Sequence, residues 1–246
     1  MGNDFVLEIA AFSLEGALAA QMAGADRIEF CDNPGEGGTT PSFGALKTAR
    51  KRIGTQLYPI IRPRGGNFVY TEDEFEIMKI DVQLCKAIKC DGVVIGMLDA
   101  DGNVDIRRCE ELVKLAGDDM GVTFHRAFDR AADPFEAMED IIDIGCERIL
   151  TSGQVPNAFD GKDLIWKLIE KADDRITIMP GSGVRSDNIV EIAKATCATE
   201  FHSSARMLFE PKKIKQKKSM DEKLATVSVD EKEIKAMIKA LEKHFR

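Results

Sequence analysis

Short apolar runs alternate with longer segments of helical periodicity along the whole chain. An apolar run over residues 5–10 opens the pattern and predicts a strand. The segment that follows has apolar positions at helical spacing: Leu14, Ala17, Leu18 and Met22. Ser13 is placed to cap this helix at its start, and Gly24 to end it. The first forty residues therefore begin with a strand and an amphipathic helix.

Seven further strand and helix pairs follow in the same order. Each later strand is a short apolar run, and each is followed by a helical pattern over 42–52, 72–89, 105–116, 133–144, 161–172, 186–195 and 230–244. Such alternation predicts parallel strands joined by crossover helices. An open doubly wound sheet is the competing architecture. The count of eight, and polar residues at the strand ends all the way round, favour an α/β fold of the (β/α)8 or TIM-barrel type.

Length fits this architecture, and one segment interrupts its rhythm. The chain has 246 residues, and a barrel of this kind needs about 250, so we expect residues 1–246 to form a single domain. Residues 211–228 contain a basic run between the eighth strand and the last helix. We predict a flexible, solvated loop there, with a phosphate-binding or lid role as the alternative.

Charge and cysteine usage exclude several classes of protein. The formal net charge is −8, which disfavours a nucleic-acid partner. No apolar run approaches the roughly 20 residues of a membrane span, and the first residues lack the basic and apolar regions of a secretory signal. The six cysteines are scattered without a CxxC pair. We expect a cytoplasmic protein with free thiols.

Two glutamates interrupt the inward faces of the first two strands. Side chains alternate along a strand, so Glu8 and Glu29 should point into the barrel near its mouth, at the same place in adjacent units. A buried carboxylate needs a partner or water. Arg62 and Arg64, at the end of the third strand, are the expected cations and would also bind an anionic substrate. A structural ion network is the alternative to a binding site.

Two of the three histidines end predicted strands. His125 is followed by Arg126 and Asp129, which are also candidates for binding an anionic substrate. An imidazole beside a carboxylate can transfer protons near neutral pH. His202 faces the interior at the end of the eighth strand. We expect both histidines to meet Glu8 and Glu29 across the mouth, with the four residues as the catalytic candidates.

Small residues after the last three strands are suited to binding an anion. They allow backbone N–H groups to approach a phosphate or carboxylate. The candidates are Ser152, Gly153, Gly181, Gly183, Ser203 and Ser204. An ordinary tight turn is the alternative for each glycine.

Cys31 differs from the other cysteines in its position. It follows the second strand directly and so lies at the barrel mouth, close to Glu29 in sequence. Thiolate is a preferred ligand of Cu(I), so Cys31 is the candidate metal ligand. No second thiol of the chain is placed to join it.

Several separate motifs closely resemble the CutC family of copper homeostasis proteins. They appear in order over 26–47, 59–71, 101–105, 122–129, 148–153, 181–185 and 200–206. The resemblance implies a barrel fold, a cytoplasmic location, Cu(I) binding through cysteines near the strand tops, and a homodimer or homotetramer. Cys31 matches one such cysteine, whereas Ala10 stands where relatives often have a second one.

Three functions remain open from the sequence. One is copper homeostasis with Cu(I) bound by Cys31. The second is a lyase, isomerase or hydrolase acting on a small phosphorylated or carboxylated substrate at the barrel mouth. The third is a binding or scaffold protein whose polar mouth only stabilises the fold. The resemblance favours the first, and the residue types at the strand ends favour the second.

Overall fold

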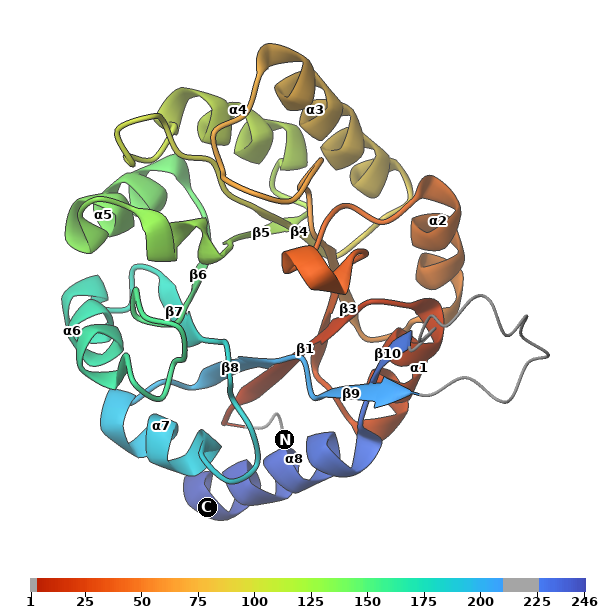
Figure 1. Cartoon of the computed structure of the whole chain (residues 1–246), viewed down its shortest axis with the longest axis vertical. Coiled ribbons are helices and arrows are strands. Elements are labelled where there is room, and N and C mark those ends of the chain that lie inside the picture. The colour runs from red at the N-terminus through yellow and green to blue at the C-terminus, as the bar shows by residue number, and fades with distance from the viewer. Residues whose placement is uncertain (1–3, 210–225) are drawn as a thin grey trace, which may run out of the picture.

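The computed structural model describes residues 4–209 and 226–246. Parallel strands surround a central axis and helices surround the strands, as Figure 1 shows. The expected (β/α)8 barrel is confirmed. No helix within the described ranges is both long and apolar enough to cross a membrane.

The barrel wall consists of two four-stranded parallel sheets, in the orders β3-β2-β1-β8 and β4-β5-β6-β7. A parallel bridge between Ile60 and Val94 joins them at the β3–β4 side. The strands are β1 (Val6–Ala11), β2 (Arg27–Phe30), β3 (Gln56–Pro59), β4 (Gly92–Ile95), β5 (Gly121–Phe124), β6 (Arg148–Thr151), β7 (Thr177–Pro180) and β8 (Glu200–Ser203). Consecutive strands are neighbours, which is what crossover helices require.

The outer layer contains eight α-helices among the described residues. They are α1 (Leu14–Ala23), α2 (Phe43–Arg52), α3 (Glu72–Ala87), α4 (Ile106–Ala116), α5 (Pro134–Ile144), α6 (Lys162–Ala172), α7 (Ile189–Thr196) and α8 (Glu231–Phe245). The predicted signals of α1 are confirmed, because Ser13 accepts a hydrogen bond from the Gly16 N–H and Gly24 ends the helix in a left-handed conformation.

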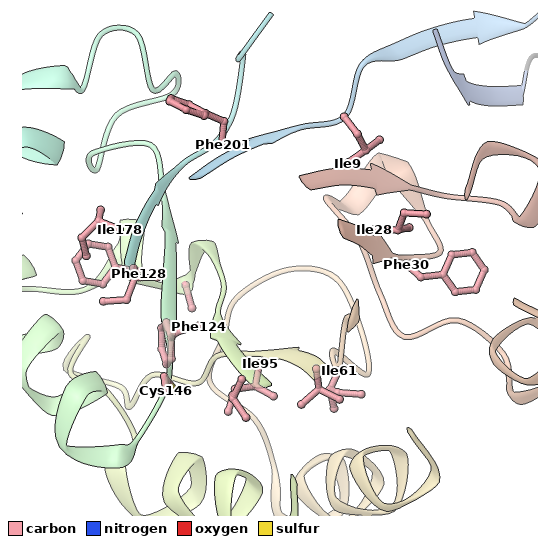
Figure 2. Packing of buried hydrophobic residues seen from close by; sticks show 14 of the residues in the cluster. Ile9, Ile28, Phe30, Ile61, Ile95, Phe124, Phe128, Cys146, Ile178 and Phe201 are labelled. Atoms are coloured by element: carbon pink, nitrogen blue, oxygen red, sulfur yellow. The ribbon is translucent and has the colours of Figure 1, made fainter. Parts of the chain in front are cut away.

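The main hydrophobic core lies between the strands and the helices. Leu7 and Ile9 of β1 and Ile28 of β2 are fully buried there. Figure 2 shows apolar side chains of several strands directed outward in this way. Because strand side chains alternate, each buried outward residue turns its neighbour toward the barrel axis. The polar residues between these apolar positions therefore meet inside the barrel.

The segment after β8 differs from the prediction of one long loop. Strands β9 (Arg206–Phe209) and β10 (Thr226–Val229) form an antiparallel hairpin, pairing Arg206 with Val229. Residues 226–228 of the predicted loop are therefore extended, because backbone pairing with β9 satisfies their polar groups. The rest of that loop, 211–225, lies outside the described residues. The hairpin places Arg206 at the carboxyl-terminal mouth of the barrel.

Candidate functional site

A cavity of about 970 Å³ opens at the carboxyl ends of the strands. Its walls come from β1, β2, β6 and β8 and from the loops that follow most strands. The lining includes Glu29, His125 and His202, together with five arginines. Its volume suits a small organic molecule. The predicted position of the site, at the barrel mouth, therefore holds a real cavity.

A buried ion network fills the barrel below this cavity. Arg27 donates to Glu8 from Nε at 2.5 Å and to Glu200 from Nη2 at 2.5 Å. Arg148 donates from Nε to the same Glu200 carboxylate at 2.6 Å. Both guanidinium groups also lie over the ring of Tyr58, at 5.3 and 5.8 Å from its centroid. The charges deep inside the barrel are thus paired, as burial demands.

The network corrects two expectations about the glutamates. Strand register pairs Glu8 with Arg27 and His202, whereas Glu29 is level with Ala10. Glu8 therefore lies one inward layer below Glu29, because the strands of a barrel are staggered. The counter-ion of Glu8 is Arg27 rather than Arg62. Arg27 precedes Glu29 by two residues, and this period-two phase was the signal in the sequence that could have identified it.

His202 connects the buried network to the cavity. Its Nδ1 lies 2.8 Å from Glu8 Oε1, and its Nε2 lies 3.6 Å from Glu29 Oε2. Burial would raise the pKa of Glu8, but Arg27, His202 and Arg148 outweigh it and lower the pKa to about 2. Burial would lower the pKa of His202, but the hydrogen bond that its Nδ1 donates to Glu8 and the charge of Glu29 raise that pKa. Glu8 thus fixes the ring and favours its protonated form.

Of the two glutamates beside His202, Glu29 is the one that faces the cavity. Burial raises the pKa of Glu29 to about 7, against the opposing attraction of His202. A carboxyl with this pKa exchanges its proton near neutral pH, which general acid–base catalysis requires. Glu8, with its low pKa, remains ionised in the same conditions. Two neighbouring carboxyls with separated pKa values are suited to different roles, one electrostatic and one in proton transfer.

His125 has a different environment from His202. Its Nδ1 accepts a hydrogen bond from the Ala127 N–H at 3.1 Å, which assigns the ring proton to Nε2. Burial, with a contribution from the charge of Arg62, lowers the pKa of His125 to about 3. The residue is 4% exposed, and its Nε2 has no hydrogen-bond partner in the described chain. His125 therefore presents a neutral donor to an acceptor oxygen.

The expected pair of His125 and Asp129 does not form. Asp129 instead accepts from Arg126 Nε at 2.7 Å and from the Thr151 and Ser152 hydroxyls. The backbone N–H of Ser152 also donates to this carboxylate, at 3.0 Å. The short helical turn after β5 directs Asp129 toward the β6 loop, away from the imidazole. Asp129 anchors that loop and partly neutralises Arg126.

Arg62 and Arg64 hold the loops of the rim together. The Arg62 guanidinium donates to the carbonyls of Glu36, Gly38 and Gly66 at 2.6 to 2.9 Å. Its buried Nε has no partner in the described residues, and it lies beside Tyr70, whose hydroxyl is also unpaired. Arg64 pairs with Glu74 and does not line the cavity. The structure thus brings Arg62, but not Arg64, to the mouth.

The small residues after β6, β7 and β8 divide into two groups. Gly183 and Ser204 line the cavity. The others, Ser152, Gly153, Gly181 and Ser203, lie behind its wall. Ser152 and Gly153 bond at the end of β6, the Gly181 N–H donates to the carbonyl of Thr151 in β6, and the Ser203 hydroxyl donates to the carbonyl of Val184 in the β7 loop. Gly181 is required there, because a Cβ would lie 2.3 Å from Leu150 Cδ1. Of these three loops, those after β7 and β8 bring small residues to the cavity.

Cys31 does not form a Cu(I) site with other described residues. It is 2% exposed, packs against Tyr58, Ile60 and Val94, and lies outside the cavity lining. Burial and the charge of Glu29 raise the pKa of its thiol well above the ordinary value. No group of three or more histidine, cysteine or acidic side chains in residues 4–209 and 226–246 is arranged to hold a metal ion. A protonated, isolated thiol does not fit Cu(I) coordination.

Comparison with known proteins identifies the family of this barrel. The model of the CutC family matches residues 5–207. The chain belongs to the CutC family. A CutC family protein from Chromobacterium violaceum is 54% identical over 203 residues, covering 82% of each chain. A CutC family protein from Parabacteroides distasonis is 44% identical over 241 residues, covering 95% of this chain and 99% of the relative.

Solved structures agree with the assignment to CutC. A crystal structure of CutC from Streptococcus agalactiae, a protein named for copper homeostasis, superposes with a TM-score of 0.77. It is 32% identical and covers 81% of this chain and 98% of its own. A thiamine phosphate pyrophosphorylase from Pyrococcus furiosus has a TM-score of 0.62 at 15% identity, which shows a common barrel fold and nothing about the reaction.

Proposed function

We propose that this CutC protein is an enzyme that transfers a proton on a small, anionic carbonyl compound bound at the barrel mouth. The observation that carries the proposal is one cavity lined by three complementary groups. Glu29 has a pKa of about 7, His202 is held by ionised Glu8, and His125 offers an unpaired neutral N–H. A network that only stabilises the fold pairs the large majority of its buried donors, so the unpaired N–H of His125 at the cavity supports a role in binding.

The three groups have separate roles in the proposed reaction. Glu29 removes a proton from the carbon next to a carbonyl group, and the carbonyl oxygen accepts a hydrogen bond from His125 Nε2. A neutral imidazole can stabilise the developing enolate oxygen by donating this hydrogen bond to it. His202, protonated beside Glu29, donates a proton to the substrate at another position, and the proton gained by Glu29 then passes to His202, which restores both groups. Glu8 stays ionised throughout. This sequence is common to isomerases and to lyases that cleave next to a carbonyl group.

Exchange of substrate hydrogen for deuterium tests the proposal. The protein is incubated in D2O with an extract of small metabolites, and mass spectrometry follows deuterium uptake. We expect a carbonyl compound to gain deuterium with the native protein and at least about 100-fold more slowly with Glu29→Gln. Glu191→Gln, at a surface glutamate that pairs with Lys162, is the matched control. Equal uptake with all three proteins, or none with any, would contradict the proposal.

Cu(I) binding by Cys31 is the second candidate function. It is supported by the copper homeostasis name of the Streptococcus agalactiae relative and by the thiol next to β2. The burial and isolation of Cys31 favour instead an indirect relation to copper, through the product of the enzyme. Anaerobic Cu(I) titration against a competing chelator decides between them. We expect the native protein and Cys31→Ala to bind equally, and a loss of tenfold or more in the variant would restore the cysteine site.

Location and assembly complete the proposal. We infer a cytoplasmic protein, because all six cysteines are free and five of them are buried. The homodimer or homotetramer implied by the family resemblance remains a prediction, and light scattering after size-exclusion chromatography measures it directly.

A further inference from the structure

We propose that Arg185 and Arg206 form an anion subsite on the β7–β8 side of the mouth and bind the phosphate or carboxylate group of the substrate. This inference rests on the proposed function and names the part of the substrate that the acid–base residues leave unassigned. It also differs from the sequence-based expectation, which gave the anion to Arg62, Arg64 and Arg126.

The arginines that line the cavity differ in how far the fold already uses them. Arg62 donates to three backbone carbonyls, and Arg126 pairs with Asp129 at 2.7 Å and donates to the Ser152 hydroxyl at 2.7 Å. The fold therefore already uses two or three of the five N–H donors of each of these side chains, and a carboxylate already compensates the charge of Arg126. Their contacts explain the rim of the cavity but not its recognition of an anion.

Arg206 retains an uncompensated charge in the described chain. Its nearest polar contact runs from Nη1 to the Pro34 carbonyl at 3.4 Å, and no carboxylate of the described residues lies within 4.0 Å of it. The guanidinium lies 5.2 Å from the centroid of the Phe12 ring, which also lines the cavity. Stacking on an aromatic ring orients a guanidinium and leaves its edge available to a planar or tetrahedral oxyanion.

Arg185 reaches the same place from the β7–α7 loop. Its Nη2 lies 3.4 Å from the Arg206 carbonyl, and its only carboxylate contact in the described chain is Glu233 at 3.9 Å. Glu233 is already held by the N–H and hydroxyl of Ser186, at 2.8 and 3.0 Å. Because both side chains line the same cavity, an oxyanion bound between them would accept a charge-assisted hydrogen bond from each.

Neutral groups beside the two arginines complete the subsite. Gly183 and Ser204 line the cavity on this side, and Gly183 has no side chain to block approach to its backbone. His125 follows β5, whereas Arg185 and Arg206 follow β7 and β8. A substrate can therefore place its carbonyl oxygen at His125 and its anionic group at the arginines. The proposed substrate is thus a phosphorylated or carboxylated carbonyl compound.

The test measures binding of simple anions to the full-length protein by two-dimensional NMR at constant ionic strength. The probes are inorganic phosphate and malonate, and the variants are Arg185→Gln, Arg206→Gln and Arg206→Lys. Arg175→Gln is the control, since Arg175 pairs with Glu139 away from the mouth. We expect the native protein to bind one probe, and each glutamine variant to bind it at least about tenfold more weakly. The lysine variant keeps the charge but not the stacked guanidinium, so we expect an intermediate affinity from it, and the native affinity from the control.

Each outcome has one meaning for the subsite. Preference for phosphate identifies a phosphorylated substrate, and preference for malonate identifies a carboxylated one. Failure of the native protein to bind either probe, or binding that both glutamine variants retain, overturns the subsite. Thermal unfolding of each variant controls for folding, and Arg206→Lys keeps the test valid if Arg206→Gln is unstable. The deuterium experiment on Glu29 has a separate readout, so failure of catalysis and failure of the subsite are distinguishable.

Discussion

Replacing Glu29 by glutamine is expected to stabilise the protein above neutral pH. In the native protein burial raises the pKa of Glu29 from 4.5 to about 7. The folded state therefore binds a proton more tightly than the unfolded chain does. Between these two pH values the native state holds more protons, so the free energy of unfolding falls as pH rises. The glutamine side chain does not titrate, so the variant does not lose free energy of unfolding in this way as pH rises.

The magnitude follows from the two pKa values. One pH unit corresponds to about 1.4 kcal/mol for a single proton, so the interval from 4.5 to about 7 amounts to about 3 kcal/mol. Glu29 is 5% exposed, so little of this value is lost to solvent screening. The hydrogen bond between His202 and Glu8 is kept in the variant, so the difference between the two proteins reports mainly on Glu29.

Urea denaturation from pH 5 to pH 9 measures the effect. We expect nearly equal free energies of unfolding at pH 5, and a variant more stable by about 3 kcal/mol at pH 9. Glu191→Gln should show no comparable dependence on pH, because Glu191 lies on the surface and pairs with Lys162. A Glu29→Gln protein that is no more stable than the native protein at pH 9 would refute the argument that burial raises this pKa.

Three further predictions concern the interior of the barrel. Gly92→Ala should lower the free energy of unfolding by about 1–3 kcal/mol, because its Cβ would lie 2.2 Å from the ring of Tyr58. Gly44→Ala is the control, since a Cβ at Gly44 would meet no close neighbour, and equal urea midpoints for the two variants would contradict the prediction. Arg27→Met should cost about 3–5 kcal/mol in the same assay, since it leaves Glu8 buried without its nearest counter-ion, and a neutral effect would argue against the network. Glu8→Gln should lower the pKa of His202 in an NMR titration, because the variant loses the carboxylate that stabilises the protonated ring; an unchanged pKa would show that Glu8 does not hold the ring.

The periodicity of the sequence was sufficient to predict the barrel. Eight short apolar runs each precede a helical pattern, and the caps of α1 occur at the predicted Ser13 and Gly24. The alternation of side chains also predicted correctly that Glu8 faces the axis; its neighbours Leu7 and Ile9 pack in the core outside the strands. These properties depend on local geometry, which neighbouring residues determine.

Partners across the barrel were decided by the tertiary structure alone. The stagger of the strands pairs Glu8 with Arg27 and places Glu29 one layer higher, at the cavity. No local pattern in the sequence encodes that register. The conformation of the loops also determines which groups meet. Arg62 donates to backbone carbonyls, Asp129 accepts from Thr151 instead of contacting His125, and Arg185 contacts the Arg206 backbone. Residues distant in sequence become neighbours only when the ring closes, so their charges, pKa values and free hydrogen-bonding groups belong to the fold as a whole.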